Sequence, residues 1–141
     1  MPLLALLVAS VLALIAALHF YWAAGGHAGR AAAVPEMNGR PTLEPGPLGC
    51  FSVGVLLVLA ALILLGRGGV VRLPGPRWLF VIGSWSVGAI LALRGIGDFR
   101  SFGLFRRVTG TRFARNDTLV YTPLCLLLAV GALCVAWRAQ G

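Results

Sequence analysis

Apolar residues occur along this chain in four long runs, separated by three more polar connections. The runs cover residues 3–22, 47–66, 77–97 and 119–137. About 20 residues of helix cross the roughly 30 Å core of a bilayer, and a helix satisfies its backbone hydrogen bonds within one segment. The pattern therefore predicts an all-α, integral membrane four-helix bundle, with four transmembrane helices and a single domain over residues 1–141.

The first run also has the position of a secretory signal peptide. It lacks a positively charged start, and its apolar stretch MPLLALLVASVLALIAAL is longer than the apolar region of such a peptide. We therefore expect it to remain as the first transmembrane helix.

Small residues recur at every fourth position in two of the runs. They are Ala5, Ala9, Ala13 and Ala17 in the first run, and Ser84, Gly88 and Ala92 in the third. Small side chains let helix backbones approach closely in lipid. The two stripes predict a tightly packed bundle.

The three connections differ in length and chemistry. Loop one (23–46) is long and rich in Gly and Pro, loop two (67–76) is short, and loop three (98–118) is polar and basic. With four spans, loops one and three lie on the same side of the membrane, here called the loop face. Loop two and both termini share the opposite side.

Composition supports a membrane protein and argues against a soluble one. The hydrophobic fraction is 59% and the charged fraction 11%, against about 45–50% and 25% in soluble domains. The mean hydropathy is +0.91. A soluble domain of this length has no way to bury so much apolar surface, so the lipid bilayer is the first predicted partner.

The charge of the chain is strongly positive, and every basic residue is Arg. The formal net charge is +8, from 12 basic and 4 acidic residues. In a soluble protein this would suggest nucleic acid. Because these arginines flank apolar runs, they fit anionic lipid headgroups instead, and we expect no nucleic acid partner.

The distribution of arginines predicts an orientation. Loops one and three hold seven of them: Arg30, Arg40, Arg100, Arg106, Arg107, Arg112 and Arg115. The opposite side holds four: Arg67, Arg72, Arg77 and Arg138. The positive-inside rule favours the loop face in the cytoplasm by this margin of seven to four, with both termini outside.

Polar side chains gather at the loop-face ends of the apolar runs. The candidate ligand-binding residues are His19, Tyr21, Trp22, Arg94, Asp98, Asp117 and Tyr121. The opposite half of the bundle is mostly Leu, Val, Ala and Gly. Ionisable residues inside membrane helices often mark functional sites, so this one-sided distribution predicts a polar cluster at one membrane face.

Helical spacing brings several of these residues together. His19 and Trp22 are three apart, so they share a helix face. Arg94 and Asp98 are four apart and predict an ion pair within the sequence A-L-R-G-I-G-D-F-R at 92–100. Asp117, Tyr121 and Cys125 form a further stripe at intervals of four.

Each of these residues also has a structural interpretation. Trp22 and Trp137 fit the aromatic belt at a membrane interface. Arg94 lies about one turn from the end of its run, close enough for its long side chain to reach the surface.

The three cysteines predict no special chemistry. Cys50, Cys125 and Cys134 form no C-x-x-C motif, and we interpret them as small apolar residues. Too few His, Cys and carboxylate side chains group together to predict a metal site, and no cofactor is predicted.

Five short motifs resemble a known family. They are H-x-Y-W-A at 19–23, A-L-R-G-I-G-D-F-R at 92–100, F-R-R-V at 105–108, T-R-F-A-R-N-D-T at 111–118 and Y-T-P-L-C at 121–125. Together they resemble a bacterial family of small four-span integral membrane proteins described as a domain of unknown function. The resemblance implies four transmembrane helices in the inner (plasma) membrane of a bacterium, and it implies no activity, substrate or cofactor.

Two functions remain open at this point. In the first, the polar cluster binds the head of an amphiphilic small molecule, with Arg94 holding an anionic or carbonyl group. His19 and Asp117 are then the acid–base candidates, and whether the protein is an enzyme stays open. In the second, the protein is a structural or accessory membrane protein whose polar cluster only locks helix packing.

Transport is disfavoured, because no charged residue lies near the middle of any run. A dimer pore stays open as an alternative, and a homo- or hetero-oligomer stays open as a partner.

Overall fold

The computed structural model describes residues 1–34, 36–37, 40–41, 46–97, 103–107 and 109–138. Its long helices are α1 (Pro2–Ala23), α3 (Pro47–Arg67), α4 (Arg77–Ile96) and α6 (Thr122–Arg138), the last continuous with α5 (Arg112–Asn116) and the π-helical segment η1 (Asp117–Tyr121). Loop one contains the short helix α2 (Arg30–Ala33) and an antiparallel pair of two-residue strands, β1 (Glu36–Met37) and β2 (Arg40–Pro41). The predicted all-α class with four membrane-spanning helices is confirmed.

The long helices α1, α3 and α4 begin and end within one residue of the predicted bounds. Pro2 and Pro47 stand in the first turns of α1 and α3. Proline is well suited to this position, because its missing N–H would have no partner there and its fixed φ is already helical.

The fourth helix begins at Arg112, and the prediction that it begins near residue 119 is wrong. Thr111 caps it, since the Thr111 hydroxyl oxygen accepts a hydrogen bond of 3.0 Å from the Ala114 N–H. A capping Thr satisfies one of the free amides that open a helix. The polar residues before the apolar run therefore belong to the helix, and Asp117 lies inside it.

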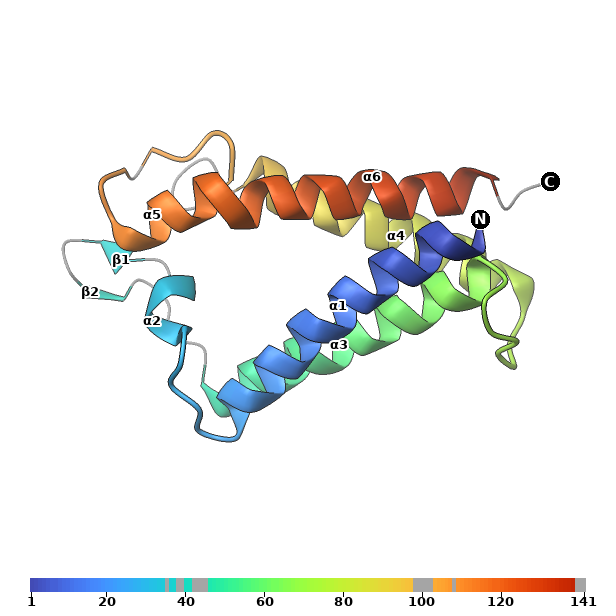
Figure 1. Ribbon diagram of the computed structural model, residues 1–141, viewed down its shortest axis with the longest axis horizontal. Coiled ribbons are helices and arrows are strands. Elements are labelled where there is room, and N and C mark those ends of the chain that lie inside the picture. The colour runs from blue at the N-terminus through green and yellow to red at the C-terminus, as the bar shows by residue number, and fades with distance from the viewer. Residues whose placement is uncertain (35, 38–39, 42–45, 98–102, 108, 139–141) are drawn as a thin grey trace.

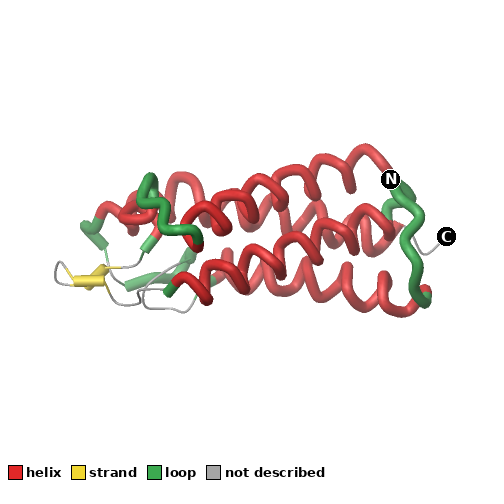
Figure 2. The backbone as a smooth tube through the Cα atoms, turned by 90° about the horizontal axis from the view of Figure 1, so that it is seen from below, coloured by secondary structure: helices red, strands yellow, loops and turns green. Residues whose placement is uncertain are grey.

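The four helices associate as two pairs. α1 packs along α3 and α4 packs along α6. Figure 1 shows the two pairs close together at the end that carries both termini and apart at the end that carries α2 and α5. We call the first the closed end. Figure 2 shows loop two connecting helices at the closed end, with the remaining connections at the loop face.

Small side chains form much of the core, which lies toward the closed end. The buried cluster includes Ala5, Val8, Ala9, Leu12, Ala61, Leu64, Val87, Leu128, Ala132 and Val135. The pairs touch where Val8 of α1 meets Gly131 of α6; a Cβ on Gly131 would lie 2.7 Å from the Val8 side chain. Close approach of small residues stabilises helix pairs in lipid.

The predicted stripes of small residues are only partly correct. Ala5 and Ala9 are buried, but Ala13 and Ala17 are exposed. An interval of four residues turns about 40° further than one helical turn, so the stripe rotates away from the contact. The buried face passes instead through Leu12 and Ala16. In the third span, Ser84 and Gly88 are buried as predicted.

Most of the apolar helix surface faces outward. Only 22% to 39% of the residues in each apolar span are buried by the protein itself. Leu3, Leu14, Leu127 and Trp137 are examples of large exposed side chains. A contiguous apolar surface of this extent requires lipid.

An arginine side chain connects two helices at the closed end. The Arg67 guanidinium, at the last residue of α3, donates from Nη2 to the Ala136 carbonyl oxygen at 3.1 Å. Carbonyls at the end of a helix lack partners within the helix and carry partial negative charge. Arg67 thus links the C-terminal ends of α3 and α6.

Gly68 offers a test of the closed end. A Cβ at this position would overlap the Cβ of Ala5, which has no rotamer by which to move away. We expect Gly68→Ala to cost about 1–3 kcal/mol and to lower the apparent melting temperature in detergent by ~3–10 °C. Gly46→Ala is the matched control, because its added Cβ meets nothing within 4 Å. Equal melting temperatures for both variants would contradict this packing.

Candidate functional site

The Asp117 carboxylate is the centre of the polar cluster. It is fully buried. Its Oδ1 accepts a hydrogen bond of 2.9 Å from Nη2 of Arg94. Its Oδ2 accepts from the Gly103 N–H at 2.7 Å, from the Thr122 hydroxyl at 3.1 Å and from Nη1 of Arg106 at 3.2 Å. A buried carboxylate needs this many donors to offset the loss of water.

These contacts join three parts of the chain. Arg94 comes from the last turn of α4, Gly103 and Arg106 from loop three, and Asp117 from η1. Arg106 is held further, since it donates to the Gly103 carbonyl oxygen at 3.1 Å and to the Thr118 hydroxyl. Among the described residues, one carboxylate faces two guanidinium groups.

A π-helical turn places Asp117 for these contacts. The Thr122 N–H bonds the Asp117 carbonyl oxygen five residues earlier, in place of the residue four earlier. Pro123 follows directly. Proline lacks an N–H and its ring crowds the carbonyl four residues before it, so an α-helix distorts at that point. Single π turns of this kind are frequent at functional sites.

The π turn also changes which side chain lies beside Asp117. Regular α-helical spacing predicts Tyr121, four residues on. The extra residue in the turn brings Thr122 to the carboxylate, and the Tyr121 hydroxyl instead donates to the Ala32 carbonyl oxygen of α2 at 3.1 Å.

A cavity of about 560 Å³ opens between the two helix pairs near the loop face. Its walls come from all four long helices and from α2. The lining residues are Ile15, Leu18, His19, Trp22, Gly29, Arg30, Ala32, Ala33, Val34, Gly49, Cys50, Val53, Arg94, Val120, Tyr121, Leu124 and Cys125. Most of this lining is apolar, with His19, Arg30, Arg94 and Tyr121 as its polar side chains.

His19 is oriented by its own helix. Its Nδ1 lies 2.8 Å from the Ile15 carbonyl oxygen. A carbonyl only accepts, so Nδ1 carries the proton, and in the neutral ring Nε2 keeps the lone pair. The ring meets Trp22 edge to face, with centroids 5.2 Å apart. His19 therefore presents a fixed ring to the cavity.

Trp22 lies in the protein interior and not in a lipid-facing aromatic belt. It is 7% exposed, and its indole N–H donates to the Ala28 carbonyl oxygen at 2.8 Å. Trp137, at the closed end, is 69% exposed, which agrees with a place in the aromatic belt.

The structure brings most of the predicted site residues to one place. His19, Trp22, Arg94 and Tyr121 line the cavity, and Asp117 lies directly behind Arg94. Tyr21 is half exposed, outside the lining, with its hydroxyl 3.5 Å from the Ala28 N–H that donates to it. Asp98, the predicted partner of Arg94, lies outside the described residues.

Several residues of the cluster and of the cavity lining were not among the predicted site residues. They are Arg30, Gly103, Arg106 and Thr122. Of these four, only Thr122 could have been found from the sequence. It stands just before Pro123, and a proline within a helix indicates a shifted helical register. The others depend on how the loops fold back.

None of the three cysteines, all of which the structure describes, forms a disulfide, and two of them share the cavity wall. Cys50 of α3 and Cys125 of α6 line it, whereas Cys134 lies nearer the closed end. Among the residues that the structure describes, no three His, Cys, Asp or Glu side chains group as metal ligands.

These features define a small four-span membrane protein with a polar cluster at one membrane face. The chain belongs to the family described as "Protein of unknown function (DUF3995)", whose model matches residues 12–132. No curated protein and no solved structure matches the chain significantly.

Replacement of Asp117 tests the cluster. Asp117→Asn keeps the shape and removes the charge that faces Arg94 and Arg106. Removing one partner of a buried ion pair costs about 3–5 kcal/mol, and because Arg94 is 32% exposed we expect a loss of about 3 kcal/mol. Thr122→Val is the control, because it removes only one hydrogen bond, worth about 1 kcal/mol. Unfolding in detergent with a denaturant gives both values. A smaller loss for Asp117→Asn than for Thr122→Val would contradict the central role of the carboxylate.

Proposed function

We propose that the cavity binds an amphiphilic small molecule, with its polar head at Arg94, His19 and Tyr121. The observation that carries the proposal is the cavity itself, because one space near the loop face collects side chains from four helices that the sequence places far apart. Its volume of about 560 Å³ falls within the roughly 300–1,000 Å³ typical of ligand sites.

The charge of the cavity favours an anionic head. Arg94 stands in the wall of the cavity, and the described lining residues include no carboxylate. Arg30 adds a further guanidinium to the lining. A planar guanidinium binds carboxylate or phosphate oxygens through two parallel hydrogen bonds.

The apolar lining suits a hydrocarbon chain. Ile15 and Leu18 of α1, Val53 of α3 and Leu124 of α6 contribute to the wall. Since the bundle is surrounded by lipid, an amphiphile would place its chain between the helix pairs and its head toward the polar end. His19 is the group through which acid–base chemistry would act on such a head, if the protein is an enzyme.

The surroundings of Asp117 favour a positioning role for this residue over an acid–base role. It has no exposed surface, and its four hydrogen bonds all come from the protein. It holds the Arg94 guanidinium at the cavity wall. This same observation favours the second candidate function, a structural protein in which the cluster only locks the bundle.

We further propose that the protein resides in the inner (plasma) membrane of a bacterium, with the loop face in the cytoplasm. The support is the excess of arginines in loops one and three. A homo- or hetero-oligomer is a further candidate partner.

A binding assay separates the two functions. The purified protein, placed in phosphatidylcholine nanodiscs, would be titrated with the fluorescent fatty acid cis-parinarate and with its uncharged methyl ester. We expect the acid to bind about tenfold more tightly than the ester, the gain typical of a charge-assisted hydrogen bond. Equal binding of acid and ester would contradict an anionic head site, and binding of neither would favour the structural role.

Arg94→Lys tests the same site by mutation. Lysine keeps the charge opposite Asp117 but loses the planar fork, so we expect a roughly tenfold weaker affinity for cis-parinarate with the fold intact. Arg72→Lys is the matched control, because Arg72 lies in loop two at the closed end. If both variants bind as the wild type does, Arg94 does not hold the head.

Reporter fusions test the proposed orientation. With both termini outside, alkaline phosphatase fused after Gly141 would be active, and a fluorescent protein fused there would stay dark. The opposite pattern would place the loop face outside.

A further inference from the structure

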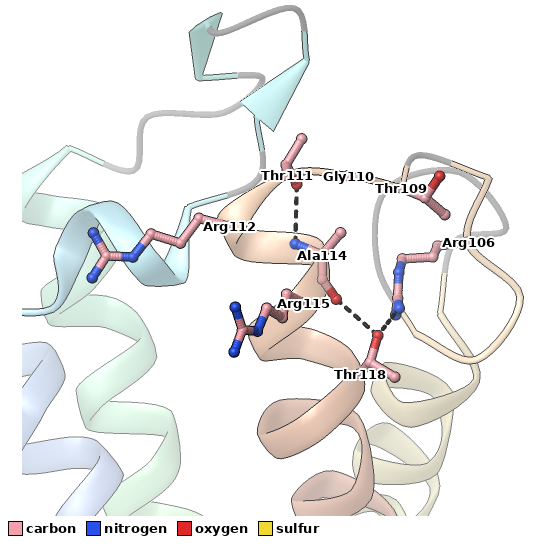
Figure 3. A pocket seen from close by; sticks show the side chains of 8 residues that line it. All are labelled: Arg106, Thr109, Gly110, Thr111, Arg112, Ala114, Arg115 and Thr118. Carbon is pink, nitrogen blue, oxygen red and sulfur yellow. Dashed lines mark hydrogen bonds between the residues drawn. The ribbon is translucent and has the colours of Figure 1, made fainter.

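A second pocket lies on the loop face, outside the cavity and on the far side of the Asp117 cluster. It has a volume of about 470 Å³ and opens at the start of the fourth helix. Its lining residues are Arg106, Thr109, Gly110, Thr111, Arg112, Ala114, Arg115 and Thr118. We call it the arginine–threonine groove. Figure 3 shows Arg106 and Thr109 on one side of the first helical turn and Arg112 and Arg115 on the other.

Three guanidinium groups line this groove, and its described lining residues include no carboxylate. Asp117, which bonds Arg106 of this lining, is itself fully buried and is shared by Arg94 and Arg106. Arg112 and Arg115 lie one helical turn apart and are both exposed. The groove is therefore a site of concentrated positive charge.

The position of Arg106 is fixed before any ligand arrives. Its side chain is 13% exposed, and its guanidinium is bonded to the Asp117 carboxylate, the Gly103 carbonyl and the Thr118 hydroxyl. A preorganised cation loses little conformational freedom on binding an anion.

The threonines supply hydroxyl donors beside these cations. The Thr111 oxygen accepts from the Ala114 N–H, and this leaves its own O–H free to donate. Thr109 is exposed at the rim. Phosphate oxygens accept hydrogen bonds in several directions, so guanidinium and hydroxyl donors together suit a phosphate group.

The groove also lies at the depth of lipid headgroups. The fourth apolar helix, Arg112–Trp137, has 26 residues and is about 39 Å long, longer than the roughly 30 Å hydrocarbon core. Its polar first turns are therefore the part that we expect to extend into the headgroup layer. In a bilayer with anionic lipids, arginines in this layer are attracted to the phosphate groups.

We propose that the arginine–threonine groove binds a phosphate group at the membrane surface, supplied by the headgroup of an anionic phospholipid. The site is separate from the amphiphile cavity and does not depend on it. Phosphate in a soluble molecule offers the same chemistry, and the test below separates the two sources.

The test measures lipid binding to the purified full-length protein in a neutral detergent by native mass spectrometry. The probes are phosphatidylglycerol, phosphatidylcholine, oleate and inorganic phosphate. We expect phosphatidylglycerol to bind more tightly than phosphatidylcholine and oleate, because only it combines a phosphate with a net negative charge in a lipid. Displacement of phosphatidylglycerol by millimolar inorganic phosphate would overturn the phospholipid as the ligand and assign the phosphate to a soluble source.

The double variant Arg112→Gln/Arg115→Gln is expected to weaken phosphatidylglycerol binding about tenfold or more. Both side chains are exposed, so the melting temperature should not change. The matched control, Arg72→Gln/Arg77→Gln, removes the same charge at the closed end and should leave the affinity unchanged. Equal losses in the two double variants, no loss in the first, or oleate binding as tight as that of phosphatidylglycerol would overturn the proposal.

Discussion

One carboxylate shared by two guanidinium groups determines how the polar end of this bundle is built. Asp117 has no contact with solvent, and it meets Arg94 and Arg106 at 2.9 and 3.2 Å. An unpaired charge at this depth would be costly, so α4, loop three and the fourth helix must come together around the carboxylate. The same interaction holds Arg94 and Arg106 at the membrane face.

Different interactions build the two ends of the bundle. At the closed end, small side chains allow α1, α3, α4 and α6 to pack closely, and Arg67 ties two helix ends together. At the loop face the pairs diverge, and a cavity of about 560 Å³ takes the place of the core. Asp117 connects the two regions, since it holds Arg94 in the wall of that cavity.

Most of the fold could be predicted from the sequence, and part of the site could. Twenty-residue apolar runs specify transmembrane helices almost by length alone, and alternate loops must share a face. The start of the fourth helix was missed because a Thr cap outweighs the polar character of residues 112–118. The Arg94–Asp117 contact could not be predicted, because the two residues are 23 apart and Asp117 enters through a π turn that regular helical spacing does not anticipate.

The central claim is that the polar cluster shapes a cavity occupied by an amphiphile. Filling that cavity tests it most directly. Val53→Trp adds bulk to the cavity wall, whereas Val58→Trp adds the same bulk to a part of α3 outside the lining. Native mass spectrometry of protein extracted gently from membranes should show a bound amphiphile on the wild type and on Val58→Trp, and its loss from a folded Val53→Trp. The same bound mass on all three proteins, or on none, would contradict the account.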